Sequence, residues 1–419
     1  MNKYERYKKV NLPWLKEIPN HWCIDKTKRF SENKKEINKG NRERNILSLT
    51  LKGVVKNNIE NPNGLTPESY ETYQIFEKND LVFKLIDLEN IKTSRVGIVE
   101  ENGIMSSAYI RLVFGSSIYP KYVYYYFFKL YIEQVYNNLG SGVRSTMNSD
   151  DLRDILLPIP PIKEQVQIAN YLDWKINEID RLIQIEKEKI KQLNQTMQIS
   201  INSRYKILNL EDETNKGVKI KYLANQITQH KGEYRRYIAL ENIISQKGMM
   251  KISFDNLEFN SDGISVEKNM VIFGKLRPYL AKTIVVENKA VCSSEFLVLN
   301  PIKLMPLYLK YLMLSSKFID LVDSSTYGTK MPRANSDFIL NLKIVVPDLS
   351  EQKKVVEKIL ESENRINKVI EVIIKKIESM ENLKQSLISE VVTGQIDVRD
   401  ITIPEYEKVA IADGEIEET

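Results

Sequence analysis

The sequence predicts an α+β protein in which two α/β domains, related by a pseudo-two-fold axis, are separated by two long antiparallel coiled-coil helices. Three observations predict this class. Much of the first half aligns with the second half at one constant shift. Each half contains short strand patterns broken by turns. Each half then continues into a long stretch without proline or glycine that carries an apolar repeat of helical period.

The alignment of the two halves is an internal repeat with a shift of 187 residues, the separation of Glu164 from Glu351. It runs without gaps from about residue 95 to about residue 200. The identical matches come in one order along the chain: Ser106-Ser107 with Ser293-Ser294, Asn148-Ser149-Asp150 with Asn335-Ser336-Asp337, and Glu164-Gln165 with Glu351-Gln352. An ordered series at one offset indicates duplication, and two copies are too few for a solenoid.

Each copy has the same internal order, which sets the expected boundaries. Strand patterns such as Asp80-Leu81-Val82-Phe83 and Met270-Val271-Ile272-Phe273 belong to two mixed domains, 1–157 and 207–345. Proline then ends the strand pattern in each copy. The helical segments follow at 158–206 and 346–397. After residue 404 the chain has six acidic residues and one lysine. We therefore define 398–419 as an acidic tail.

The two helical segments carry heptad repeats that predict a seam between them. The seam positions are Ile176, Ile179, Ile183, Ile190 and Leu193 in the first segment, and Ile366, Ile370, Ile373, Ile377 and Met380 in the second. Glu186 interrupts the first repeat. The 187-residue shift superimposes Ile179 on Ile366, so the seam itself is duplicated. The alternative is that each helix packs only on its own domain.

Several classes of chemistry lack their sequence signals in this chain. It has no phosphate-binding loop, no dinucleotide-binding glycine motif and no motif of an amino-methyltransferase. Two cysteines and two histidines make a disulfide framework or a zinc site implausible. Asp348 and Glu351 superficially resemble a nuclease motif, but their spacing favours the start of a helix. We therefore expect no catalytic centre, no metal site and, without a signal peptide or membrane span, a cytoplasmic protein.

Four segments together resemble the specificity subunit of type I restriction-modification systems, the HsdS family. They are the motif 157–165 (LPIPPIKEQ) with its second copy at 345–352, the C-terminal motif 387–399 (LISEVVTGQIDVR), the N-terminal motif 14–22 (WLKEIPNHW) and the segment 273–282 (FGKLRPYLAK). The resemblance covers nearly the whole chain. It departs from the family pattern at Gln395, where lysine is more usual, and the second half lacks the N-terminal motif.

The resemblance implies two target-recognition domains, each reading one half of a split, asymmetric sequence of double-stranded DNA. The two helices would set the unread spacer and dock two modification subunits, which hold S-adenosylmethionine and methylate adenine. Restriction subunits, which use ATP and Mg, would accompany some complexes. The chain itself would hold no cofactor, would not be an enzyme, would not bind a membrane, and would work in the bacterial cytoplasm.

Residues with directional donors next to glycines or turns are the candidates for DNA contact, because such donors reach phosphates and base edges. The candidates in the second half are Lys275, Arg277, Tyr279, Lys282, Lys330 and Arg333. The candidates in the first half are Lys84, Lys92, Arg95 and Arg144. The competing interpretation of the loops that carry Arg144 and Arg333 is a turn capped by Asn148 or Asn335.

Two other interpretations stay open at this point. The chain could be a structural coiled-coil adaptor without sequence-specific DNA binding, or a standalone methyltransferase or nuclease. The equivalent basic loops in both halves argue against the adaptor, and the absent cofactor motifs argue against the enzyme. The aromatic run from Tyr119 to Tyr131 could be a base-stacking platform, but its helical spacing favours a core helix.

Overall fold

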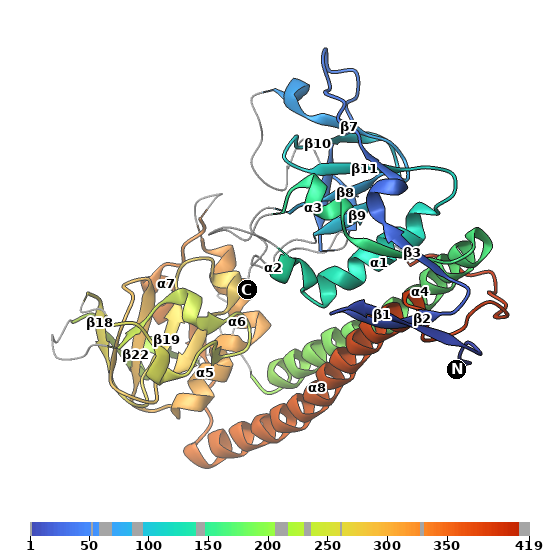
Figure 1. Cartoon of the computed structure of the whole chain (residues 1–419). Coiled ribbons are helices and arrows are strands. Elements are labelled where there is room, and N and C mark those ends of the chain that lie inside the picture. The colour runs from blue at the N-terminus through green and yellow to red at the C-terminus, as the bar shows by residue number, and fades with distance from the viewer. Residues whose placement is uncertain are drawn as a thin grey trace. The chain divides into compact units, whose positions relative to one another are not determined.

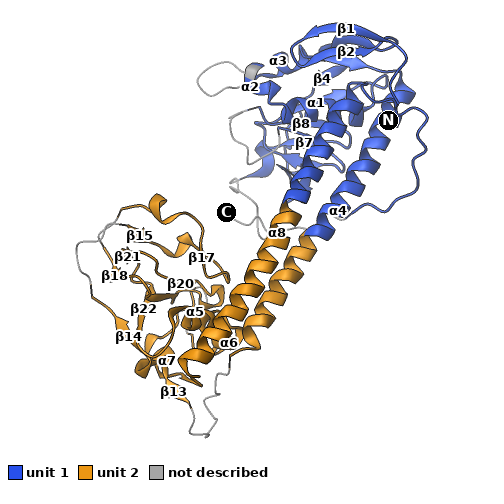
Figure 2. Cartoon of the chain, turned by 90° about the horizontal axis from the view of Figure 1, so that it is seen from below, with its two compact units in different colours: residues 1–186, 375–419 blue, residues 187–374 orange. Residues whose placement is uncertain are grey.

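The computed structural model forms two compact units, and the chain crosses between them within its two long helices (Figure 2). Unit 1 contains residues 1–186 and 375–419, and unit 2 contains residues 187–374. The structure describes residues 2–51, 53–57, 69–85, 95–139, 147–205, 217–229, 236–259, 262–326 and 331–409.

Unit 1 is built on a four-stranded antiparallel sheet of order β4-β11-β8-β9 (Figure 1). Its strands are β4 (Ser31–Asn33), β8 (Leu81–Phe83), β9 (Val96–Ile98) and β11 (Ile110–Phe114). Four further antiparallel pairs surround it: β1 (Tyr7–Leu12) with β2 (Leu15–Pro19), β3 (Cys23–Lys26) with β12 (Leu156–Ile159), β5 (Leu47–Thr50) with β6 (Gly53–Lys56), and β7 (Gln74–Phe76) with β10 (Gly103–Met105).

Helix α1 (Pro120–Ile132) packs against β9 and places the aromatic run in the core of unit 1. Tyr122, Tyr126 and Phe127 are fully buried, so the prediction of a core helix rather than a stacking platform is confirmed. The same unit contains the short helices α2 (Val135–Leu139) and α3 (Ser149–Arg153), and the 3-10 turns η1 (Thr27–Arg29) and η2 (Tyr70–Thr72).

Unit 2 repeats this plan with a four-stranded sheet of order β14-β22-β19-β20. Its strands are β14 (Ala224–Ile227), β19 (Val271–Gly274), β20 (Thr283–Val285) and β22 (Phe296–Pro301). A second sheet has the order β15 (Tyr237–Ile238), β21 (Ala290–Cys292), β18 (Ile264–Val266). Two short pairs complete the strands: β13 (Val218–Lys219) with β23 (Lys343–Ile344), and β16 (Ile243–Ile244) with β17 (Met249–Met250).

The helices of unit 2 also follow those of unit 1. They are α5 (Pro306–Leu314), α6 (Ser316–Ser324) and α7 (Ser336–Asn341), with 3-10 turns η3 (Ile220–Tyr222), η4 (Leu240–Asn242), η5 (Phe254–Asn256) and η6 (Pro278–Leu280). Gln165 accepts a hydrogen bond from the Tyr119 amide just before α1, and Gln352 accepts one from the Met305 amide just before α5. The duplicated Gln therefore performs the same structural task in both units.

The long helices are α4 (Ile162–Asn202) and α8 (Leu349–Val392), and each is continuous. Lys376 pairs with Glu186 at 2.9 Å, and Lys384 pairs with Asp180 at 2.6 Å. Because the α8 numbers fall as the α4 numbers rise, the helices run antiparallel. The charged Glu186 that interrupts the heptad repeat is 5% exposed, and Lys376 neutralises it. Glu351 lies in the exposed first turn of α8, as expected for a helix start.

The predicted seam positions lie on the inner sides of these helices. In unit 1, Ile179 and Ile183 belong to the hydrophobic core, and Ile176, Ile377 and Met380 pack against it. In unit 2, Ile373 is buried, and the remaining predicted positions Ile190, Leu193, Ile366 and Ile370 are half-buried. Within the described residues, no helix is long and apolar enough to span a membrane.

The segment after α8, which the sequence predicts to be an acidic tail over 398–419, packs on unit 1 over its described residues. Val398 is fully buried, and Ile401 and Ile403 pack on the core of unit 1. Gln167 and Asn177 of α4 hold this segment by hydrogen bonds to the carbonyls of Val398, Ile401 and Glu407. Residues 398–409 are therefore part of unit 1, because their apolar side chains find a surface that the sequence pattern alone does not reveal.

Candidate nucleic-acid interface

Two basic segments that the sequence analysis treated separately meet beyond the end of β19 in unit 2. The Arg277 amide donates to the Pro332 carbonyl at 2.8 Å, and the Ala334 amide donates to the Lys275 carbonyl at 2.8 Å. Leu276 and Arg333 form an antiparallel bridge between these bonds. We call this site, made of Lys275, Arg277, Tyr279 and Arg333, the basic corner.

The backbone of the basic corner is sharply turned. Arg277 and Ala281 flank η6 with φ values of 51° and 45°, in the left-handed region that non-glycine residues rarely adopt. Pro278 restricts the turn between them. This geometry leaves the side chains of Arg277 and Tyr279 exposed while Pro278 is buried. A strained turn that presents a cation and an aromatic ring to solvent is typical of a binding site.

The charge of the basic corner is only partly compensated. Arg333 pairs with Glu295 at 2.9 Å. Burial lowers the pKa of the Lys275 ammonium, and the nearby positive charge of Arg333 lowers it further, whereas Glu295 acts in the opposite direction. Within the described residues, Glu295 is the one carboxylate that pairs with any of these three cationic side chains. A phosphate bound there would stabilise the charged form of Lys275.

Lys282, another predicted DNA contact, bonds within unit 2, and its contact with DNA stays a prediction. Its Nζ donates to the Leu240 carbonyl at 2.8 Å, and its side chain is half-buried. Burial is the main cause of the lowered pKa of Lys282, with Lys251 adding to it. The ammonium thereby holds the η4 turn.

The corresponding place in unit 1 shares one of these backbone bonds. The Met147 amide donates to the Leu85 carbonyl at 3.2 Å, so the described residues that follow β8 and precede α3 lie side by side. Met147 corresponds to Ala334 by the 187-residue shift. The half-buried Lys84 lies at this junction, and its amide donates to the Arg95 carbonyl at 3.0 Å. Lys92, Arg144 and Lys330 lie outside the described residues.

Arg95, another predicted DNA contact, is only 2% exposed, and its role at DNA stays a prediction. Its positive charge lowers the pKa of Tyr131 of α1, against the larger raising effect of burial. The sequence could not distinguish the two positions, because an arginine at a strand start can point either into the unit or away from it.

The predicted caps of the short helices are present. Asn148 accepts hydrogen bonds from the amides of Asp150 and Asp151 at the start of α3, and Asn335 accepts one from the Asp337 amide at the start of α7. The caps and the basic residues are thus compatible, because the asparagines hold the helix starts while Arg333 points to solvent.

The sequence analysis did not identify Glu295, because no pattern around this residue indicates an ion pair with Arg333.

A profile of the family described as "Type I restriction modification DNA specificity domain" matches this chain twice, at residues 15–195 and 199–379. The chain belongs to the type I restriction-modification DNA specificity family. Its two matches coincide with the internal repeat. Within the ranges that the structure describes, no group of three or more His, Cys, Asp or Glu residues could hold a metal ion.

Two curated specificity subunits of the family resemble the chain in sequence. The type I restriction enzyme MjaVIII specificity subunit of Methanocaldococcus jannaschii is 23% identical over 336 residues, which is 72% of this chain and 76% of that protein. The EcoDI specificity subunit of Escherichia coli is 23% identical over 140 residues, which is 32% of this chain and 31% of that protein.

A solved structure supports the fold. A chain from a study of complex assembly and conformational transition of the type I R-M system matches with a TM-score of 0.65 at 12% identity, covering 90% of this chain and 99% of that one. The α+β class, with two repeated units and two long helices, is therefore confirmed for this specificity-family member.

Proposed function

We propose that this chain is the DNA-reading subunit of a type I restriction-modification complex and that each unit contacts one half of a bipartite, asymmetric site. The observation that carries this proposal is the basic corner of unit 2 and the matching framework in unit 1. In both units the end of a central strand bonds to the loop before an Asn-capped helix. The duplication supports two reading sites of one kind on one chain.

In the proposed complex the basic corner has two tasks. Lys275 is half-buried beside Arg333 and Glu295, and its ammonium suits a phosphate, whose contacts set register. Arg277 is exposed and able to donate to a phosphate or to the edge of a guanine. We infer that unit 1 reads a different half-sequence, because the residues after Lys84 differ from those after Lys275.

Exposed apolar side chains on the long helices support a scaffolding role. Among them are Leu182, Ile185 and Leu383 in unit 1, and Val369, Val372 and Ile199 in unit 2. The 187-residue shift relates Leu182 to Val369 and Ile185 to Val372. All four of these side chains are at least 44% exposed. One equivalent patch in each unit suits two copies of one partner. We assign each patch to the binding of one modification subunit.

The chemistry of the complex would come from these partners. The modification subunits would hold S-adenosylmethionine and methylate adenine, with or without restriction subunits that use ATP and Mg. The long helices would set the number of unread base pairs between the half-sites. In this arrangement the chain supplies recognition and assembly and catalyses no step.

The experiment that tests this function combines binding with mapping of methylated adenines. The chain is purified with its modification subunits, and DNA containing its methylated sites is compared with unrelated DNA in gel-shift assays at several salt concentrations. We expect sequence-specific binding that weakens as salt rises. The methylation map of cells should lose one bipartite site when this gene is deleted. No difference between the two DNAs, with an unchanged map, would instead support the adaptor.

A further inference from the structure

The turn between β16 and β17 connects the basic corner with helix α4 inside unit 2. The Gln246 amide donates to the Leu280 carbonyl at 2.9 Å, and its side-chain Nε2 donates to the Tyr279 carbonyl at 3.4 Å. On its other side, the Gln246 carbonyl accepts a hydrogen bond of 3.3 Å from Nε2 of Gln198 in α4. One residue therefore bonds both to η6, which carries the exposed Tyr279, and to the long helix.

Lys247 adds a second link to the helices. Its ammonium donates to Oδ1 of Asn194, one helical turn before Gln198 on α4. Burial lowers the pKa of Lys247, while the negative charge of Glu363 on α8 acts in the opposite direction. Glu363 in turn accepts a hydrogen bond of 2.5 Å from the Tyr311 hydroxyl of α5.

The backbone of this turn has little freedom to shift. Gln246 has a φ of 59° and Gly248 has a φ of 63°, both in the left-handed region. A Cβ atom at Gly248 would lie 2.8 Å from Cδ1 of Leu314, so α5 closes the turn from behind. The glycine is needed both for its φ and for the close approach. The turn is thus clamped between η6, α4 and α5.

We propose that Gln246 and Lys247 are positioning residues that hold the basic corner at one distance and angle from helix α4. They thereby decide which spacer lengths the complex accepts. This inference rests on the proposed function. Their hydrogen bonds hold the corner from behind, so loosening them should leave the half-sequence unchanged. It should allow the corner to reach a half-site displaced by one base pair.

The test removes the helix side of both bonds and leaves the basic corner untouched. We compare the wild-type complex with Asn194→Ala/Gln198→Ala on DNA whose spacer is correct, one base pair shorter or one base pair longer. The measured quantity is the rate of methylation of wrong-spacer DNA divided by the rate on correct-spacer DNA. This ratio should be about tenfold higher in the double variant than in the wild type, as expected when one or two hydrogen bonds are lost. Affinity for the correct site should change less than about twofold.

Three control variants sharpen this test. Gln195→Ala alters an exposed glutamine of the same helix and should keep the wild-type preference for DNA with the correct spacer. Asn194→Asp retains an acceptor for Lys247 and should also remain strict. Lys247→Met removes only the ammonium, and this single substitution should weaken the preference for the correct spacer. It gives a second measurement if the double variant unfolds early.

Two outcomes would overturn the positioning role. One is an unchanged preference for the correct spacer in both Asn194→Ala/Gln198→Ala and Lys247→Met. The other is a loss of affinity for the correct site with a shallower salt dependence, which would make the turn a DNA contact. A wild-type complex without any site preference would contradict the proposed function itself, so the two failures are distinguishable.

Discussion

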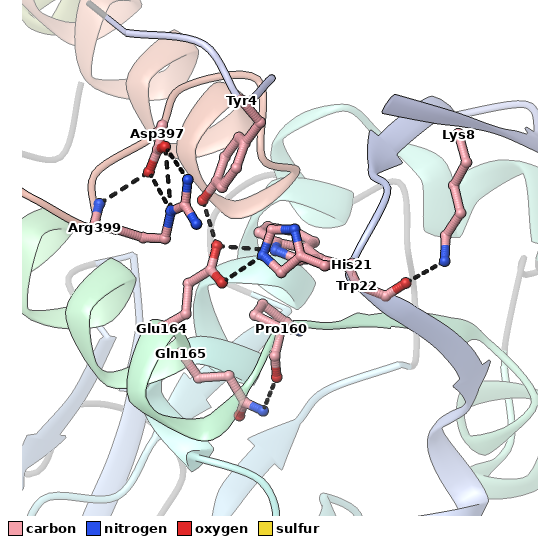
Figure 3. A network of polar contacts seen from close by, with 9 residues as sticks. All are labelled: Tyr4, Lys8, His21, Trp22, Pro160, Glu164, Gln165, Asp397 and Arg399. Carbon is pink, nitrogen blue, oxygen red and sulfur yellow. Dashed lines mark hydrogen bonds and ion pairs between the residues drawn. The ribbon is translucent and has the colours of Figure 1, made fainter. Parts of the chain in front are cut away.

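The indole Nε1 of Trp22 donates a hydrogen bond of 2.9 Å to Oε1 of Glu164 and thereby joins the N-terminal segment to the first turn of α4 (Figure 3). The Tyr4 hydroxyl donates to the same oxygen at 2.5 Å, and Nε2 of His21 lies 2.9 Å from Oε2. Glu164 is 6% exposed. Its repeat equivalent Glu351 is exposed and pairs with Lys354 at 3.3 Å, so only one copy uses this residue as an internal anchor.

The Glu164 anchor predicts an asymmetric effect of one substitution made in both copies. Glu164→Ala should lower the free energy of unfolding of unit 1 by roughly 2–4 kcal/mol, because it leaves the Tyr4 and Trp22 donors buried without their acceptor. Glu351→Ala should change the free energy of unfolding of unit 2 by less than about 0.5 kcal/mol, as is usual for a surface position. Chemical denaturation followed by tryptophan fluorescence reports the unfolding of unit 1, since all three tryptophans, Trp14, Trp22 and Trp174, belong to it, and circular dichroism of the same samples reports both units. Equal effects would contradict the assignment.

The basic corner predicts a change in salt dependence. Lys275→Ala/Arg277→Ala should weaken DNA binding and reduce the slope of log affinity against log salt by about 0.9 for each lost phosphate contact. Lys268→Ala is the matched control, because this exposed lysine precedes the opposite end of the same strand, β19. Fluorescence anisotropy at several salt concentrations gives both slopes. If the double variant keeps the wild-type affinity and salt slope, the basic corner does not contact DNA.

The duplicated apolar patches predict that the two modification subunits bind independently. Leu182→Glu/Ile185→Glu should abolish one binding site, and Val369→Glu/Val372→Glu should abolish the other, because a buried unpaired carboxylate is strongly unfavourable. Native mass spectrometry should then count one modification subunit instead of two in each variant and none when they are combined. Two subunits bound to the combined variant would mean that the partners dock elsewhere.

The helices predict a specific change in spacer. Four residues inserted after Glu188 and four after Ile374, close to the Glu186–Lys376 pair, lengthen both helices by about 6 Å. The seam rotates by only about 40°, because four residues advance a helix by about 400°. The spacer in the methylation map should grow by one or two base pairs of about 3.4 Å each, with both half-sequences unchanged. An active variant with the original spacer would contradict the role of the helices.

A two-residue insertion at the same positions is the control for that experiment. It rotates the seam by about 200° and turns the isoleucine side chains away from one another. We expect loss of the paired helices, visible as reduced helical circular dichroism, together with loss of methylation. Full activity in this variant would show that the seam does not hold the complex together.

Features that depend on neighbours along the chain could be predicted. The aromatic run from Tyr119 to Tyr131 is a core helix, and Asn148 and Asn335 cap helices, because spacing and capping are local properties. The burial of Arg95 and the inward bond of Lys282 could not be predicted. Both depend on the surroundings that other segments create, and a single basic side chain carries no sign of its direction.

By itself, the sequence determined the duplication, the two long helices and the family, since each is a repeated or contiguous pattern that survives without coordinates. Only the tertiary structure decided that Arg277 meets Pro332, that residues 398–409 pack on unit 1, and that Gln246 bonds to both η6 and α4. These contacts join residues far apart in the chain. Their partners are chosen by sheet register and by the shape of the packed core, which no local pattern specifies.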